Sequence, residues 1–209
     1  MKITKHTAEE AVFPYIAYIP ETCSAHPAMI LQLHGIGERG NGGDDLDLVL
    51  VNGFAKIVND TNLTDCILIM PQCPTDSFWL ARIESIKAFI DQMMEKYAVD
   101  PDRLYMAGIS MGAFGTWYSA VAYPKLFAAI APCCGGCLAP HVSELTMPIW
   151  AFHGLEDTAV PPVHTVDMIN ALQDTNPHFR YTLYEGVGHN CWDLAFNEKL
   201  LAWLLKQHK

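Results

Sequence analysis

Short apolar runs alternate with amphipathic segments along the whole chain. Most of these runs are continuously apolar rather than alternating, which is typical of strands that are buried on both faces of a parallel sheet. The predicted strands are residues 15–19, 28–33, 66–70, 103–107, 128–131, 149–152 and 180–184. The sequence therefore predicts a mostly parallel central sheet of about seven strands.

The amphipathic segments between these runs are predicted to be helices. Between residues 81 and 97, Ile83, Ile86 and Ile90 recur at three- and four-residue intervals, and the charged residues between them fall on the opposite face. The same pattern, over shorter lengths, covers residues 111–122, 163–172 and 196–206. A strand-then-helix order favours right-handed crossovers, so the predicted fold class is α/β, with helices packed on an open sheet.

Composition limits the possible classes of protein. The chain has 209 residues, of which 51% are apolar and 17% charged, as in a folded globular domain. No linker, repeat or charge block interrupts the pattern, so a single domain over residues 1–209 is predicted. The formal net charge of −10 argues against nucleic acid or an anionic membrane surface as a partner.

Cysteine usage and the N-terminal segment predict the compartment. Seven cysteines cannot all pair within one chain, and the residues after Met1 are polar, unlike the apolar core of a signal peptide. The longest apolar stretches, such as residues 66–71 and 127–134, are far shorter than the ~20 residues that cross a bilayer. We therefore expect a cytoplasmic protein without a membrane partner.

Ser110 is the strongest candidate for chemistry. It lies in the motif Gly108-Ile109-Ser110-Met111-Gly112, directly after a predicted strand and directly before a predicted helix. So sharp a turn holds the serine in strained backbone angles that expose its hydroxyl, and the two glycines remove Cβ atoms that would collide there. We interpret Ser110 as a nucleophile rather than as part of a turn without chemistry.

A nucleophilic serine needs a base and an acid that orients the base, at the ends of later strands. Asp157 follows the strand 149–152 and His189 follows the strand 180–184, so both are expected at the same sheet edge as Ser110. Glu156 is the alternative acid. The alternative for Asp157 is a structural role as a turn or helix-capping residue. The glycine-flanked loop around His189 favours a base over a structural histidine.

Acyl transfer places negative charge on the former carbonyl oxygen, so hydrogen-bond donors are needed at that point. One predicted donor is the backbone N–H of Met111, which begins the helix after Ser110. The second is expected from the loop after the strand 28–33, with Ile36 as the first choice and Gly37 as the alternative.

Other motifs are assigned no catalytic role. The glycine-rich run 35–43 lacks the Gly-Lys-Ser or Gly-Lys-Thr end of a phosphate loop. Cys133, Cys134 and Cys137 look like half of a zinc site, but without a second pair they are predicted to be buried or loop thiols. His34 and His153 are predicted to hold their loops by hydrogen bonds. No metal and no cofactor is expected.

Several longer motifs resemble a known family. They are residues 33–41, 71–74 with 78–79, 100–105, 108–112, 150–154 with 157, and 188–189 with 192. Over nearly the whole chain, the sequence resembles the α/β-hydrolase fold serine esterases, within them the phospholipase/carboxylesterase-like group that includes predicted peptidases. It is also similar in size and strand order to dienelactone hydrolases, which have cysteine where Ser110 stands.

The resemblance implies an α/β-hydrolase fold, a three-layer αβα sandwich. It also implies Ser110 as nucleophile, Asp157 as acid, His189 as base, and the amides of Ile36 and Met111 as the oxyanion hole. Only about 15 residues separate the strand after the nucleophile helix from the next strand, so no helical cap is expected. The candidate pocket residues are Gly37, Phe78, Trp79 and Trp192, and for the three aromatic residues ordinary core packing is the alternative.

The predicted function is hydrolysis of carboxylic esters through an acyl-enzyme intermediate. Because an uncapped site is open, it suits short-acyl, carbohydrate or aromatic esters better than the substrates of a lid-gated lipase. The expected partner is therefore a small-molecule or carbohydrate ester. The alternatives are a serine peptidase of the prolyl-oligopeptidase type, a thioesterase, and an inactive fold that serves as a binding module.

Overall fold

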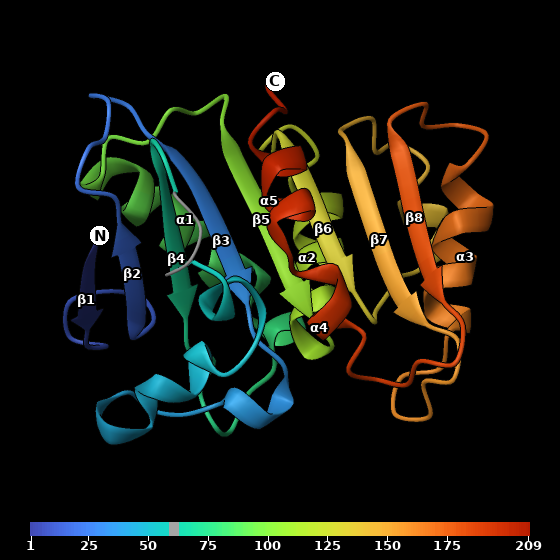
Figure 1. The fold of residues 1–209 in the computed structure, drawn as a ribbon, viewed down its shortest axis with the longest axis horizontal. Coiled ribbons are helices and arrows are strands. Elements are labelled where there is room, and N and C mark those ends of the chain that lie inside the picture. Colours follow the sequence, from blue (N-terminus) through green and yellow to red (C-terminus); the bar gives the residue numbers. More distant parts are fainter. Residues whose placement is uncertain (59–62) are drawn as a thin grey trace.

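The computed structural model describes residues 1–58 and 63–209, and its centre is one eight-stranded sheet (Figure 1). The strands are β1 (Lys2–His6), β2 (Tyr15–Ile19), β3 (Ala28–Leu33), β4 (Cys66–Pro71), β5 (Leu104–Ile109), β6 (Ala129–Cys133), β7 (Ile149–Gly154) and β8 (Phe179–Tyr184). Their order across the sheet is β1-β2-β4-β3-β5-β6-β7-β8. Only β2 pairs antiparallel with both of its neighbours, so the sheet is mostly parallel, as predicted.

Helices and 3-10 turns cover both faces of the sheet. The helices are α1 (Ile83–Lys96), α2 (Met111–Ala122), α3 (Val163–Leu172), α4 (Trp192–Ala195) and α5 (Glu198–Leu204). The turns are η1 (Ile36–Glu38), η2 (Gly43–Leu50), η3 (Gly53–Lys56), η4 (Trp79–Arg82) and η5 (Ala139–His141). None of these helices combines the length and apolarity needed to cross a membrane, a finding limited to the described residues.

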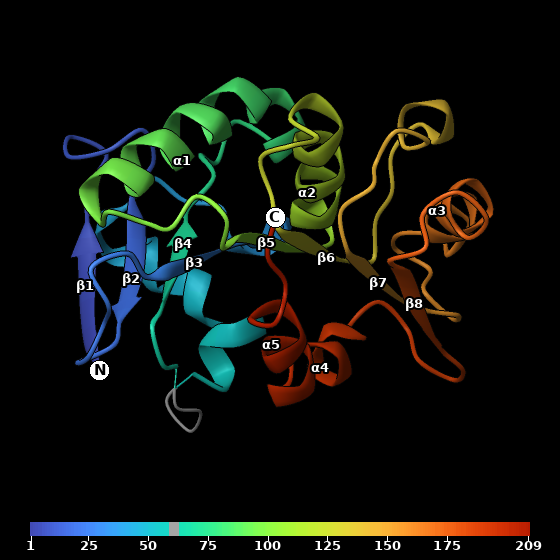
Figure 2. The same ribbon diagram turned by 90° about the horizontal axis from the view of Figure 1, so that it is seen from above.

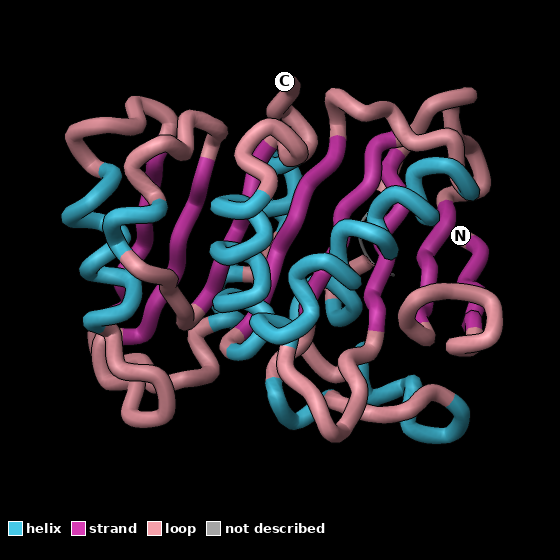
Figure 3. Tube along the Cα trace, turned by 180° about the vertical axis from the view of Figure 1, so that it is seen from behind, coloured by secondary structure: helices cyan, strands magenta, loops and turns pink. Residues whose placement is uncertain are grey.

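The three longest helices lie on one face and the two C-terminal helices on the other (Figures 2 and 3). Side chains of α1, α2 and α3 form one hydrophobic cluster with the sheet, and side chains of η3, α4 and α5 form a second. Every residue of β3, β4 and β5 is buried, because these central strands have a layer on each side. This three-layer arrangement is the α/β-hydrolase fold that the resemblance implies.

The structure adds an eighth strand to the predicted seven. β1 pairs antiparallel with β2 at the edge of the sheet, and its side chains are exposed or only partly buried. Such a strand lacks the continuous apolar run that identifies the central strands, and the lysines at positions 2 and 5 suit an unprotected edge.

Three segments differ from the helices that the periodicity predicts. Residues 81 and 82 of the segment 81–97 belong to the 3-10 turn η4, so α1 begins only at Ile83. The segment 196–206 is shorter in the structure, because Asn197 interrupts it and caps α5 with its side chain, which accepts hydrogen bonds from the N–H groups of Lys199 and Leu200. Residues 43–56, where nothing was predicted, form η2 and η3.

The connection between β6 and β7 decides how open the sheet edge is. Residues 134–148, all within the described part of the chain, contain only the short turn η5. No helical cap is therefore inserted at this position, in agreement with the sequence.

Candidate active site

Ser110 occupies the turn between β5 and α2. Its φ of 54° and ψ of −116° lie outside the regions that non-glycine residues normally adopt. A hydrogen bond of 2.8 Å from its backbone N–H to the carbonyl of Cys133 in the adjacent strand holds this conformation. A Cβ at Gly112 would overlap the backbone of Leu33, and one at Gly108 would overlap the carbonyl of Gly112. Both glycines are therefore required for the close approach of α2 to the sheet.

Ser110, His189 and Asp157 form a hydrogen-bonded chain. His189 follows β8 and Asp157 follows β7, so both lie at the same edge of the sheet as Ser110. His189 Nε2 is 2.9 Å from Ser110 Oγ, and His189 Nδ1 is 2.6 Å from Asp157 Oδ2. Because a carboxylate can only accept, Nδ1 carries the proton, and in the neutral imidazole Nε2 is free to accept the serine hydroxyl.

The environment of Asp157 distinguishes it from Glu156. Asp157 is 4% exposed, and its Oδ1 accepts hydrogen bonds of 2.9 Å from the backbone N–H groups of Ala159 and Val160. Burial alone would raise the pKa of Asp157, but the hydrogen bonds from His189 and these amides lower it below its ordinary value. Glu156 is exposed, so Asp157 is the acid that contacts the imidazole.

The imidazole of His189 is more basic than an isolated histidine. Its contact with the Cys134 side chain is the largest influence, and together with the hydrogen bond and charge of Asp157 it raises the pKa of His189 to about 9. Partial burial acts in the opposite direction. The protonated form of His189 is therefore well stabilised at this position.

A cavity of about 190 Å³ opens beside Ser110 and His189. Of the predicted site residues, Ile36, Gly37 and Trp192 line it, but Met111 does not. In the described part of the chain, no hydrogen bond uses the backbone N–H groups of Ile36, Gly37 or Met111. Amide donors are thus available both at the start of α2 and in the loop after β3.

Phe78 and Trp79 do not line this cavity. Trp79 is 0% exposed, packs edge-on against Phe13 and His34, and donates a 3.0 Å hydrogen bond to the His34 carbonyl. Phe78 is half-exposed, with the Arg39 guanidinium 5.1 Å from its ring centre. The pocket prediction is therefore wrong for these two residues, because one belongs to the core and the other to the surface.

The sequence analysis did not identify two polar residues that line the cavity. Asn52 accepts a 3.1 Å hydrogen bond from Trp192 Nε1 and donates one of 3.0 Å to Glu38 Oε1. Both Asn52 and Glu38 line the cavity. Glu38 lies in the glycine-rich motif, which was a usable signal, whereas Asn52 lies in a segment without recognisable periodicity.

His34 and His153 have the structural roles that the sequence predicts. His34 Nδ1 donates to the Gly35 carbonyl at 2.6 Å, and its Nε2 accepts the N–H of Cys73 at 2.9 Å. Burial lowers the pKa of His34 to about 4, so its ring is neutral. His153 bridges Thr165 Oγ1 and the Val160 carbonyl. Both histidines fix loops that carry site residues.

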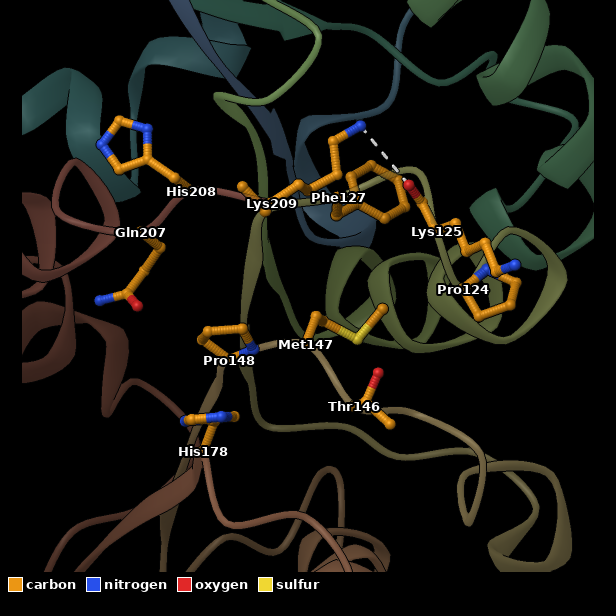
Figure 4. Close-up of a pocket in the computed structure, with 11 residues that line it drawn as sticks. Pro124, Lys125, Phe127, Thr146, Met147, Pro148, His178, Gln207, His208 and Lys209 are labelled. Carbon is orange, nitrogen blue, oxygen red and sulfur yellow. Dashed lines mark hydrogen bonds between the residues drawn. The ribbon is translucent and has the colours of Figure 1, made fainter.

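A second cavity, of about 490 Å³, lies at the opposite ends of the strands (Figure 4). Pro148 precedes β7 and His178 precedes β8, whereas the Ser110 site follows the last residues of the strands. A 3.5 Å hydrogen bond from Lys209 Nζ to the Lys125 carbonyl crosses its rim (Figure 4). This cavity holds no serine, so it offers no equivalent of the Ser110 chain.

Comparison with known proteins identifies the family. A model of the phospholipase/carboxylesterase family matches residues 78–199, which is more than half of the chain and includes Ser110, Asp157 and His189. The chain belongs to this family. The family match and the fold agree with the resemblance noted in the sequence motifs.

Curated relatives of this phospholipase/carboxylesterase family member are much longer proteins. This chain is 46% identical over 52 residues to a poly(3-hydroxyalkanoate) depolymerase C of Paucimonas lemoignei. The match covers 25% of this chain and 13% of that protein. The chain is 28% identical over 149 residues to a bifunctional acetylxylan esterase/xylanase of Neocallimastix patriciarum, covering 67% of the chain and 21% of that protein. The chain thus spans only a small part of either relative.

Solved structures share the fold of this family member. A thermostable esterase superposes with a TM-score of 0.81 at 27% identity, covering 100% of this chain and 63% of the other. The feruloyl esterase module of Clostridium thermocellum, solved with sinapinate, gives a TM-score of 0.71 at 16% identity, covering 93% of this chain and 83% of the other. The second likeness concerns the fold alone.

Proposed function

We propose that the protein hydrolyses carboxylic esters with Ser110 as nucleophile, His189 as general base and acid, and Asp157 as the residue that orients His189. The observation that carries this proposal is the pair of distances, 2.9 Å from Ser110 Oγ to His189 Nε2 and 2.6 Å from His189 Nδ1 to Asp157 Oδ2. Both are hydrogen-bond distances, the first between nucleophile and base and the second between base and orienting acid.

In the first half of the reaction, Ser110 Oγ forms a bond to the ester carbonyl carbon while His189 Nε2 takes the hydroxyl proton. The carbonyl π electrons move to oxygen, where the amides of Met111 and of Ile36 or Gly37 stabilise the charge. When the carbonyl re-forms, the bond to the alcohol oxygen breaks and His189 returns the proton to that oxygen. Water then repeats these steps on the acyl-enzyme and releases the acid.

The uncharged His189 is the reactive form, and Asp157 fixes its tautomer. Because Asp157 also accepts the N–H groups of Ala159 and Val160, its carboxylate cannot rotate freely away from the ring. Without the carboxylate, nothing would hold the imidazole in the tautomer that leaves Nε2 free to accept the serine proton.

The substrate class that we propose is a short-acyl ester, or an ester of a carbohydrate or aromatic compound. The 190 Å³ cavity is small compared with the roughly 300–1,000 Å³ of sites that enclose drug-sized ligands, which favours a small acyl group. The uncapped edge of the sheet leaves room for a bulky alcohol. The name of the curated relative, a bifunctional acetylxylan esterase/xylanase, supports a short-acyl ester of a carbohydrate.

Single substitutions test the proposed triad. For Ser110→Ala and for His189→Ala we expect p-nitrophenyl acetate hydrolysis to fall by roughly 1,000-fold or more, because triad members act as a unit. Ser143→Ala and His141→Ala are matched controls, since both side chains are exposed in the β6–β7 connection. Retention of activity within tenfold in both triad variants would refute the assignment.

A fluorophosphonate probe separates an active hydrolase from an inactive binding module, because it labels only an activated serine. We expect labelling of the parent protein and none of Ser110→Ala.

Ester, thioester and amide versions of one chromogenic acyl group separate an esterase from a thioesterase or a peptidase. We expect the ester to react with the highest kcat/KM, and a faster amide would favour the peptidase.

A further inference from the structure

Three cysteine thiols meet beside the candidate active site. Cys133 is the last residue of β6, Cys134 follows it, and Cys191 precedes α4. The Sγ atoms are 3.9 Å apart for Cys133 and Cys134, 3.4 Å for Cys133 and Cys191, and 3.2 Å for Cys134 and Cys191. All three residues are buried, and all seven cysteines, which lie in the described part of the chain, are free thiols.

The membership of this cluster differs from the sequence-based grouping. Cys137, which the sequence groups with Cys133 and Cys134, instead contacts the Met168 sulfur at 3.6 Å. Cys191 takes its place from a segment 57 residues away along the chain. The fold thus completes a three-sulfur set that the sequence shows only in part.

The three sulfur atoms have the spacing of a metal-binding face. A triangle with these sides has a circumradius of about 2.0 Å, so a point ~2.3 Å from every sulfur, the usual zinc–sulfur distance, lies about 1 Å outside their plane. The sulfur–ion–sulfur angles at that point would be roughly 90–115°, close to tetrahedral. The three sulfur atoms would occupy three of the four positions of such an ion.

The backbone of Cys134 is a second observation at this cluster. Its φ of 61° lies in the left-handed region, which non-glycine residues rarely adopt. The adjacent strand β5 ends in the same way, at the strained Ser110. Strain of this kind is concentrated at functional sites, and the Sγ of this strained residue lies 3.2 Å from the Cys191 Sγ.

We propose that Cys133, Cys134 and Cys191 form a binding site for one soft divalent cation of the zinc and cadmium type. Sulfur ligands select soft metal ions over magnesium or calcium. In the binding step three S–H bonds break, three metal–sulfur bonds form and three protons are released, so two positive charges and three thiolates leave a complex of charge −1. No electron is transferred, and no oxidant is required.

Occupation of this site would act on the base of the proposed reaction. Cys134 donates its S–H to the His189 carbonyl at 3.3 Å, and Cys191 lies two residues after His189. A metal-bound thiolate has no proton to donate, so the carbonyl of His189 loses this bond. For this consequence, which rests on the proposed function, we expect ester hydrolysis to fall when the cation binds.

Cadmium binding tests the site without reference to catalysis. The reduced protein, kept in a phosphine reductant, is titrated with Cd²⁺ while the ultraviolet sulfur-to-metal charge-transfer band is recorded. We expect a saturable band at one ion per chain. Cys191→Ser and Cys133→Ala should each weaken binding at least ~100-fold, because loss of even an outer-shell partner costs 10–100-fold.

Matched controls separate this cluster from other thiols. Cys23→Ser and Cys137→Ser remove the two cysteines that are not buried and should leave the band unchanged. Ser110→Ala should also bind normally, since it removes the nucleophile but no sulfur, so failure of the esterase proposal does not affect this readout. Circular dichroism checks that each cysteine variant is folded.

Two results would overturn the proposal. One is the absence of a saturable band with all thiols reduced, or a band that survives both Cys191→Ser and Cys133→Ala. The other is a Cys134–Cys191 disulfide, seen as a loss of two hydrogens in the intact mass, in a protein that takes up no cation after reduction. That second result would assign the cluster to disulfide chemistry instead.

Discussion

At the scale of single residues, the basicity of His189 determines how the proposed reaction depends on pH. Only the neutral imidazole can accept the proton of Ser110, and the pKa of about 9 means that the neutral form grows as pH rises from 7 toward 9. The raised pKa therefore lowers activity at neutral pH and moves the rising limb of the profile upward from the ordinary value near 6.5.

We predict that kcat/KM for a chromogenic acetate ester rises with pH between 7 and 9 and levels off above the pKa of His189. Cys134→Ala should move this limb to lower pH, because the largest influence that raises the pKa of His189 is removed. Ser110→Ala, measured at each pH, corrects for spontaneous hydrolysis. A limb centred at or below pH 6.5 in the parent protein would contradict the prediction.

Asn52 gives a second prediction at this scale. Asn52→Ala removes the hydrogen bonds to Trp192 and Glu38, so both side chains lose their fixed orientation at the cavity wall. We expect kcat/KM to fall by about tenfold, mainly through a higher KM, which corresponds to one or two hydrogen bonds of ~1 kcal/mol each. Asn170→Ala, on the exposed side of α3, is the control and should change neither constant.

At the scale of elements, the site depends on how closely α2 approaches the sheet. Gly112→Ala would place a Cβ against the carbonyls of Leu33 and His34, so α2 would have to move away from β3. We expect a loss of stability of about 1–3 kcal/mol, although alanine ordinarily favours a helix over glycine. A lower thermal unfolding midpoint and weaker fluorophosphonate labelling measure the two consequences.

Gly37→Ala is the stability control for this prediction. No atom lies within 4 Å of the position that a Cβ would take at Gly37, and its φ is not in the left-handed region. The unfolding midpoint of Gly37→Ala should therefore stay close to that of the parent protein. Equal loss of stability in both variants would mean that the tight α2–β3 contact is not the cause.

At the scale of the whole molecule, the absence of a cap between β6 and β7 and the small cavity together govern substrate choice. We predict that kcat/KM is highest for acetyl and butyryl esters and falls at least about tenfold for octanoyl esters, since a longer chain cannot bury its methylenes at ~0.8 kcal/mol each in so small a space. A p-nitrophenyl ester series measures this directly. An octanoyl preference would show that the acyl group binds elsewhere.

The single-domain organisation stays a prediction, because the chain spans only part of its curated relatives.

The sequence by itself determined the fold class, the central strands and the three long helices. These elements carry strong local signals, namely continuous apolar runs in β3, β4 and β5 and a helical period in α1. The turn at Ser110 was recognisable too, because the close approach of α2 to the sheet requires glycine at positions 108 and 112. The sequence analysis missed the edge strand β1 and the turns η2 and η3, because their segments carry no such signal. It also missed the interruption of the last helix at Asn197.

Only the tertiary structure decided which side chains meet at the site. Trp79 and Trp192 look alike in the sequence, but one is enclosed by the core and the other lines the cavity, because the path of each loop is set by packing against distant segments. The same holds for Asn52 at the cavity wall and for Cys191 beside Cys133 and Cys134. Local patterns specify elements, whereas contacts between residues far apart along the chain arise only when the layers pack.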